Sequence, residues 1–178
     1  MKTYTLVGGV DGVGKTSLLG VLVAIKYDIG VIIDSDLIDQ KAAIERINSS
    51  IEKGINLTQE TTLSGSRTLK TINKAREHDY FIRLYYIGVN TAEESMKRIK
   101  NRVEKGGHTI PDDDVIRRYN KRFDDLIAIL PYCDEVFLYD NENGFVESAE
   151  YKNAKLIIKV DSVPEWLKEL KQVLDGKK

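Results

Sequence analysis

The stretch GVDGVGKT, residues 9–16, satisfies the pattern G-x-x-x-x-G-K-[ST] at every fixed position. It follows a short apolar segment, residues 3–7, and opens a segment with helical periodicity that begins at Lys15. Glycines permit backbone angles that other residues resist, and a helix N-terminus carries partial positive charge. A strand, this loop and a helix therefore predict a cradle of backbone N–H groups that binds phosphate.

The pattern also gives roles to individual side chains. Lys15 is expected to reach the β- and γ-phosphates of a nucleotide, and the Thr16 hydroxyl to ligate Mg²⁺. Asp11 is unusual in such a loop: its carboxylate would face Mg²⁺ through water, an incoming substrate, or solvent in a turn. The predicted nucleotide contacts within the loop and the start of the helix are Gly9, Asp11, Gly12, Val13, Gly14, Lys15, Thr16 and Ser17.

Periodicity along the rest of the chain alternates strands with helices. Strands are predicted over residues 3–7, 31–33, 56–61, 80–87, 134–139 and 156–160, and helices over residues 15–26, 36–53, 66–78, 92–104, 111–130 and 163–174. This order indicates an α/β fold in which a mostly parallel sheet carries helices on both faces. Together with the glycine loop of residues 9–16, it predicts the three-layer sandwich of a P-loop NTPase. Since no linker or repeat interrupts it, we expect a single domain over residues 1–178.

Composition limits the classes of partner. The 178 residues include 42% hydrophobic and 31% charged residues, values typical of a folded protein rather than a disordered one. With 27 Lys and Arg against 28 Asp and Glu, the net charge of −1 gives no overall attraction to nucleic acid or to a membrane. The longest apolar stretch, residues 18–25, is shorter than the ~20 residues that cross a bilayer. One cysteine, Cys133, fits a reducing compartment, so we expect a cytoplasmic protein.

Two acids follow the second predicted strand, in the sequence Asp34-Ser35-Asp36. In open α/β sheets, ligands bind at the carboxyl ends of the strands. We assign Asp36 as the base that accepts a proton from a hydroxyl nucleophile. We assign Asp34 to holding Mg²⁺ or its water shell. The alternative is that Asp36 caps the following helix.

Basic residues gather over residues 97–122, on both sides of a glycine pair at Gly106 and Gly107. We interpret this segment as a helical lid that closes on a polyphosphate, with Arg102 and Arg118 as the leading phosphate contacts. The alternative for most of these residues is a solvated face with i,i+4 ion pairs, such as Asp114 with Arg118. The cluster consists of Lys97, Arg98, Lys100, Arg102, Lys105, Arg117, Arg118, Lys121 and Arg122.

Four stretches together resemble a known family. They are GVDGVGKTS from residue 9, VIIDSD from residue 31, QETTLSG at residues 59–65 and YYIGVNTAEESMKRIKNRVEKGGHTIPDDDVIRRY at residues 85–119. Over about residues 1–142 the chain resembles the zeta-toxin-like P-loop kinases, especially a short bacterial branch also labelled predicted ABC-type ATPases. The resemblance implies transfer of phosphate from ATP, with Mg²⁺, to a hydroxyl of a small molecule such as a UDP-sugar, and an antitoxin as a candidate partner.

The resemblance also implies residue roles. It matches Asp36 to the catalytic base and Arg102 to the first lid arginine. Its substrate-side contacts fall on Asp36, Glu60, Thr61 and His108, and Asn141 lies in the adenine region. His108 stands where the toxins carry a second arginine, and Arg117 or Arg118 would supply that charge.

Two other functions remain open on the sequence. Asp11 makes the loop similar to that of nucleotide kinases, and Asp-Ser-Asp after a second strand also occurs in shikimate kinases. A nucleotide or shikimate-like kinase is therefore the alternative enzyme. A non-catalytic ATP-binding regulatory protein is the alternative of another class.

Overall fold

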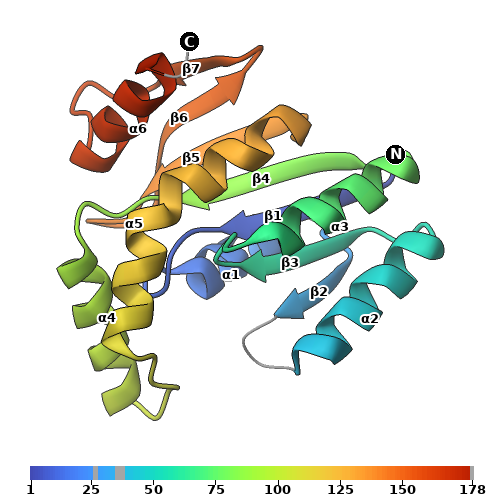
Figure 1. Cartoon of the computed structure of the whole chain (residues 1–178), viewed down its shortest axis with the longest axis horizontal. Helices are drawn as coiled ribbons and strands as arrows, with labels where there is room; N and C mark the ends of the chain where they lie inside the picture. Colours follow the sequence, from blue (N-terminus) through green and yellow to red (C-terminus); the bar gives the residue numbers. More distant parts are fainter. Residues whose placement is uncertain (26–27, 35–38, 177–178) are drawn as a thin grey trace.

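The computed structural model describes residues 1–25, 28–34 and 39–176. Its centre is a seven-stranded sheet in the order β2-β3-β1-β4-β5-β6-β7 (Figure 1). The first five strands pair in parallel and the last two add an antiparallel hairpin. The strands are β1 (Thr3–Gly8), β2 (Val31–Asp34), β3 (Leu57–Thr61), β4 (Phe81–Ile87), β5 (Glu135–Asp140), β6 (Val146–Lys152) and β7 (Lys155–Ile158).

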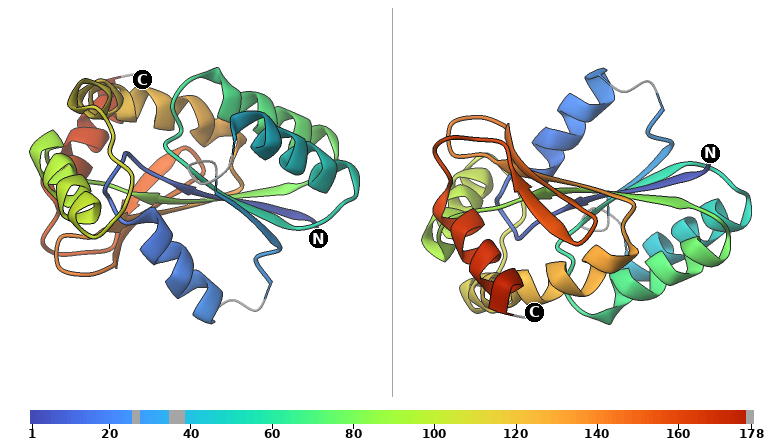
Figure 2. Two further views of the ribbon diagram at one scale, coloured as in Figure 1. Left: turned by 90° about the horizontal axis from the view of Figure 1, so that it is seen from below. Right: turned by 90° about the horizontal axis from the view of Figure 1, so that it is seen from above.

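Helices cover both faces of the sheet, as the sequence predicts (Figure 2). One face carries α1, and the opposite face carries α2, α3, α5 and α6. The fold is therefore the expected three-layer α/β sandwich with a mostly parallel sheet. The helices are α1 (Lys15–Ile25), α2 (Gln40–Glu52), α3 (Ser66–Glu77), α4 (Ala92–Glu104), α5 (Asp112–Ile129) and α6 (Glu165–Gly176), with a short 3₁₀ turn at Leu130–Tyr132.

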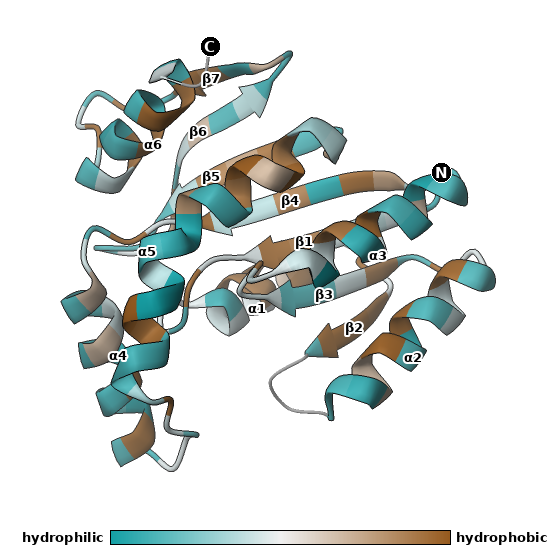
Figure 3. Cartoon of the chain, viewed as in Figure 1, coloured by the Kyte–Doolittle hydropathy of each residue, from teal (hydrophilic) through white to brown (hydrophobic). Residues whose placement is uncertain are grey.

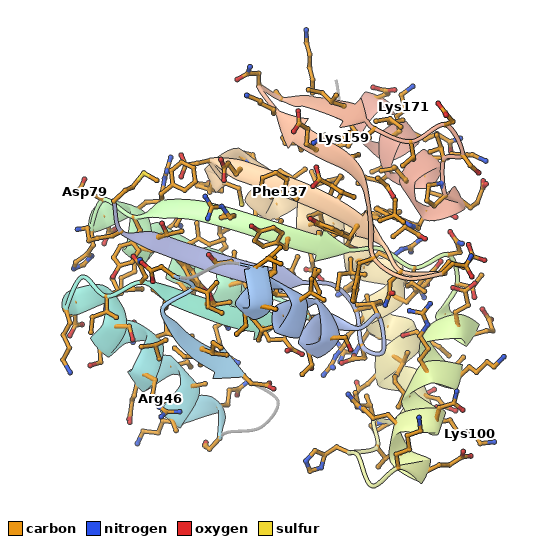
Figure 4. All side chains as sticks on the ribbon, turned by 180° about the vertical axis from the view of Figure 1, so that it is seen from behind. Arg46, Asp79, Lys100, Phe137, Lys159 and Lys171 are labelled. Atoms are coloured by element: carbon orange, nitrogen blue, oxygen red, sulfur yellow. The ribbon has the colours of Figure 1, made fainter. Side chains whose placement is uncertain are left out.

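Alternation along the central strands divides the core into two clusters. Tyr4 and Leu6 of β1 face the larger cluster under α2, α3, α5 and α6, whereas Val7 faces the smaller cluster under α1. Hydrophobic residues follow the strands and the sheet-facing sides of the helices (Figure 3). Phe137 of β5 stacks on Tyr85 of β4, with ring centroids 5.2 Å apart, on the face that carries α1 (Figure 4).

Two sequence expectations differ from the structure. No strand is predicted over Val146–Lys152, yet β6 forms there and pairs with both β5 and β7. The helix after β2 starts at Gln40 rather than at residue 36, because the Asp39 carboxylate accepts a hydrogen bond from Lys41 N and occupies the N-cap.

No helix among residues 1–25, 28–34 and 39–176 is long and apolar enough to cross a membrane.

Candidate functional site

The carboxyl ends of three parallel strands meet beside the glycine loop. Glu60 of β3 lies in register with Asp34 of β2 on one side and with Val7 of β1 on the other. The loop leaves β1 immediately afterwards. β1 lies between β3 and β4, and the chain crosses from one side of β1 to the other between these two strands. Such switch points are where open α/β sheets bind ligands.

The glycine loop has the backbone that its sequence predicts. Gly12 has a φ of +76° and Gly14 a φ of +101°, values that residues with a side chain rarely adopt. The loop ends in α1, whose first turn is closed by a hydrogen bond of 2.9 Å from Leu18 N to Gly14 O. The Lys15 side chain is buried and its Nζ donates to Val10 O at 3.1 Å, which keeps the ammonium inside the curve of the loop.

Thr16 and Glu60 are in direct contact. The Thr16 hydroxyl donates to Glu60 Oε1 at 3.0 Å, and Glu60 is 5% exposed. Glu60 therefore contacts the Thr16 hydroxyl, which is expected to ligate Mg²⁺. The family resemblance instead implies that Glu60 contacts the substrate.

Asp11 is buried, which excludes the alternative that its carboxylate is exposed to solvent in a turn. Its exposed fraction is 2%, and its Oδ2 accepts a hydrogen bond from Arg118 Nη1 at 2.8 Å. The Asp11 carbonyl accepts a hydrogen bond from the Ser95 hydroxyl of α4. The tip of the loop is thus held from two sides, by α4 and by α5.

A cavity of about 530 Å³ opens over this edge of the sheet. It brings together several residues that are predicted from the sequence to act in the site, and it is closed by the segment that connects α4 and α5. The predicted residues that line it are Asp11, Thr16, Asp34, Glu60, Arg102, His108 and Arg118; Gly107, Thr109, Ile110, Pro111 and Asp114 complete its wall.

The connection between α4 and α5 is held by arginines. Arg102 Nη2 donates to the His108 carbonyl at 3.0 Å, and the His108 side chain is exposed. Asp114 pairs with Arg117 at 2.7 Å, an i,i+3 pair rather than the expected i,i+4 pair with Arg118, because Arg118 turns toward Asp11. The hydrogen bond from Arg117 lowers the pKa of Asp114, so this carboxyl stays ionised at neutral pH.

Asn141 and Arg98 support the other side of the loop. Asn141 Nδ2 donates to Val13 O at 2.9 Å, while Arg98 donates to the carbonyls of Asn141 at 2.8 Å and Val13 at 3.4 Å. Asn141 thus lies against the loop, beside Gly14. Arg98 and Ser95 contact the glycine loop, but the sequence does not single them out for this role. Arg98 is one of many basic residues in its segment, and a serine within a helix does not by itself indicate a functional contact.

Three predicted residues lie elsewhere or outside the described part. Ser17 is exposed on the first turn of α1. Thr61 lines a second, smaller cavity beside the first. Asp36 falls outside the described residues, and its role as a base stays a prediction. The N-cap of α2 in the described part of the chain is Asp39.

The oxygen atoms at the sheet edge fit a magnesium ion. Mg²⁺ usually takes one or two carboxylates, a phosphate and several waters rather than a full cage of protein ligands. The Thr16 hydroxyl, 3.0 Å from Glu60, and the neighbouring Asp34 provide such a partial set. Among the described residues no group of three or more His, Cys, Asp or Glu forms a complete metal cage.

Comparison with known proteins gives one sequence relative with substantial coverage. An uncharacterized protein of Haemophilus influenzae is 32% identical over 127 residues, which span 62% of this chain and 88% of that protein. The chain belongs to the family of this protein. No protein-family model matches the chain.

Two solved structures share the fold. The structure of the PezAT chromosomal toxin–antitoxin system of Streptococcus pneumoniae superposes with a TM-score of 0.64 at 20% identity, over 99% of this chain and 86% of that one. The structure of AvrRxo1-ORF1:-ORF2 with ATP gives 0.62 at 14% identity, over 98% of this chain and 63% of that one. The chain has a zeta-toxin-like P-loop kinase fold.

Proposed function

We propose that this protein is an ATP-dependent phosphotransferase that moves the γ-phosphate of ATP to a hydroxyl of a small molecule. The observation that carries the proposal is one cavity into which Thr16, Glu60, Asp34, Arg102 and Arg118 all reach, at the mouth of the glycine loop. Phosphoryl transfer needs groups that position the phosphates, oxygen ligands for a metal ion, and positive charge that can approach the transferred phosphoryl group. Residues of each kind line this cavity.

The donor side is built from the loop. Backbone N–H groups of residues 9–16 and the Lys15 ammonium would bind the phosphates of ATP. Thr16 with Asp34 and Glu60 would hold Mg²⁺, which neutralises charge on the β- and γ-phosphates when bound. Asn141, in contact with Val13, would lie near the adenine.

Asp36 is the proposed base of the acceptor side. It follows Asp34 by two residues, and Asp34 lines the cavity. The acceptor hydroxyl oxygen forms a bond to the γ-phosphorus, its proton passes to the Asp36 carboxylate, and the bond from phosphorus to ADP breaks. Arg102 and Arg118 would stabilise the charge on the phosphoryl group during transfer.

The segment over residues 97–122 is the proposed lid of a single domain. Because Ser95 and Arg98 contact the glycine loop, the start of α4 is attached to it, and we place the moving part at the connection around Gly106 and Gly107.

A cytoplasmic location is part of the same proposal. The solved PezAT toxin–antitoxin system supports an antitoxin as a candidate partner, and we expect no nucleic-acid or membrane partner.

The finer substrate remains a proposal with alternatives. A UDP-sugar is the acceptor that the family resemblance suggests, and a nucleotide or shikimate is the acceptor of the alternative kinases. If the site binds ATP without transferring phosphate, the regulatory protein is the function that remains.

The test is phosphate transfer from labelled ATP to sugar nucleotides, nucleotides, free sugars and sugar acids. Asp36→Asn should lower turnover by about 10² to 10⁴ while ATP binding is retained. Asp39→Asn is the matched control, since asparagine also caps helices and the N-cap of α2 is preserved. Lys15→Ala should impair ATP binding. Full turnover in the Asp36 variant would contradict its role as the base.

A further inference from the structure

A second cavity, of about 220 Å³, adjoins the nucleotide cavity. It is lined by α2, by the segment that follows β3 and by the first turns of α3, and Arg118 lines both cavities. Arg118 therefore stands between the loop that would bind ATP and a separate space large enough for a small molecule. The hydroxyl-bearing residues around this space are Thr61, Thr62, Ser64, Thr68 and Thr71.

Thr68 is the most informative of these residues. It is 5% exposed, and its hydroxyl has no hydrogen-bond partner within the described part of the chain. The Thr68 oxygen is not among the fully enclosed atoms that lack a hydrogen-bond partner, and the side chain lines the cavity. A hydroxyl that faces a cavity and has no protein partner is available to a ligand hydroxyl.

A positively charged side chain lines the α3 end of this cavity. The first turn of α3 contains no acid, and the Gly65 N–H at its N-terminus already donates to the Asp125 carboxylate of α5. Arg67, in this turn, lines the cavity, and no carboxylate among the described residues pairs with it. A guanidinium group that lines a cavity without a carboxylate partner is suited to a carboxylate or phosphate of a ligand.

The volume restricts the size of the ligand. At ~30 Å³ for each water in the liquid, 220 Å³ corresponds to about seven waters. Pockets for larger organic ligands usually measure about 300 to 1,000 Å³. A single sugar ring or an open-chain sugar acid is of the right size for this cavity alone, whereas a UDP-sugar would have to extend into the adjoining cavity.

We propose that the phosphate acceptor is a compact polyhydroxylated anion, a sugar acid or a sugar phosphate, held by Thr68 and by Arg67 at the N-terminus of α3. This inference rests on the proposed function for the phosphate donor, ATP. The acceptor's anionic group lies at α3, and one of its hydroxyls points past Arg118 to the γ-phosphate. That hydroxyl oxygen becomes bonded to phosphorus, its proton is lost to the base, and ADP leaves.

Binding and transfer are measured separately to test this. The probes are D-glucuronate and glucose 6-phosphate, with glucose as the neutral match and UDP-N-acetylglucosamine as the large acceptor. Calorimetry with a non-hydrolysable ATP analogue gives affinity, and labelled ATP gives transfer. We expect the protein to bind at least one anionic probe more tightly than glucose, and Thr68→Val and Arg67→Gln each to weaken that binding about tenfold. ATP affinity should stay within about twofold.

Matched controls separate recognition from stability. Thr68→Val removes a hydroxyl that has no partner, so the melting temperature should not fall. Thr58→Val removes a hydroxyl that donates to Ile29 O at 2.6 Å, so it should lower the melting temperature and leave probe binding unchanged. Arg46→Gln, at an exposed position of α2 that does not line the cavity, controls for loss of a positive charge (Figure 4).

The outcomes distinguish the two proposals. Binding of an anionic probe through Thr68 and Arg67 without phosphate transfer would uphold the acceptor site and count against the kinase. Transfer to UDP-N-acetylglucosamine or a nucleotide that is unaffected by Thr68→Val would overturn the acceptor inference and uphold the kinase. Equal affinity for glucose and glucuronate would overturn the inference that the acceptor is an anion. If no probe bound at all, the whole inference about the acceptor would be overturned.

Discussion

The carboxylate of Asp11, in the glycine loop, accepts a hydrogen bond of 2.8 Å from Arg118 of α5, across 107 residues of sequence. The pair joins the loop that would bind phosphate to the helix that lines both cavities. Arg118 is therefore oriented by the loop itself, and a change at Asp11 should be felt on both sides of the site.

A double-mutant cycle tests this link. Asp11 is 2% exposed, and the Arg118 side chain is 27% exposed, so we expect Asp11→Asn and Arg118→Gln each to lower the free energy of unfolding by about 1 to 3 kcal/mol. Their coupling energy should be about 1 kcal/mol, measured by urea unfolding of the single and double variants. Additive effects, within about 0.5 kcal/mol, would show that the pair has no energetic role.

Gly12 should not tolerate a side chain. Its φ is +76°, and an added Cβ would lie 2.6 Å from the Ser95 carbonyl of α4. Gly12→Ala should lower both the melting temperature and the affinity for ATP, because α4 and the loop must move apart. Gly20→Ala is the control: an added Cβ there meets nothing within 4 Å, and alanine should stabilise α1 by about 0.5 to 1 kcal/mol. Equal melting temperatures for the two variants would be evidence against close contact at Gly12.

Arg98 should affect ATP rather than the acceptor. Arg98→Leu removes the donors to Val13 O and Asn141 O, and both groups support the loop beside the proposed adenine region. We expect KM for ATP to rise about tenfold with a smaller change in kcat. Lys100→Gln, at an exposed position on the same helix (Figure 4), should leave both constants unchanged. A loss confined to kcat would assign Arg98 to the chemical step instead.

Cys133 should be a slow thiol in the folded protein. Burial, together with the nearby Asp134 carboxylate, raises the pKa of Cys133 to about 12. At pH 8 the folded chain should react with a maleimide far more slowly than the chain in urea, because the thiolate is the reactive form. Since the unfolded thiol ionises near pH 8.5, this group should reduce stability as pH rises above that value. Equal labelling rates with and without urea would contradict the burial of the thiol.

The glycine loop and the α/β order could be predicted from the sequence because each depends on local patterns, whereas the zeta-toxin-like fold was expected from the resemblance of four stretches to that family. Fixed positions from Gly9 to Thr16 and the alternation of strands with helices carry that information. Strand β6 was missed because its seven residues, VESAEYK, are mostly polar and gain their place by pairing with β5 and β7. Pairing across a hairpin leaves little trace in hydrophobic periodicity.

The site was predictable in composition but not in its contacts. The sequence brings Thr16, Glu60 and Arg118 to the site without showing that Thr16 bonds Glu60 or that Arg118 bonds Asp11, since both contacts depend on how distant segments pack. Thr68 carried no sequence signal. A threonine in a polar helix is ordinary until the structure shows that its hydroxyl is buried at a cavity and has no partner among the described residues.

The register of β3 also limits how this chain can accept insertions. Gln59 bonds the Tyr4 hydroxyl on the face of α2 and α3, whereas the next residue, Glu60, meets Thr16 on the face of α1. Because side chains alternate, one residue inserted early in β3 would exchange these two positions and present an amide to Thr16. Insertions that spare the site should therefore fall in loops such as residues 153–154, far from β3 in the sheet order.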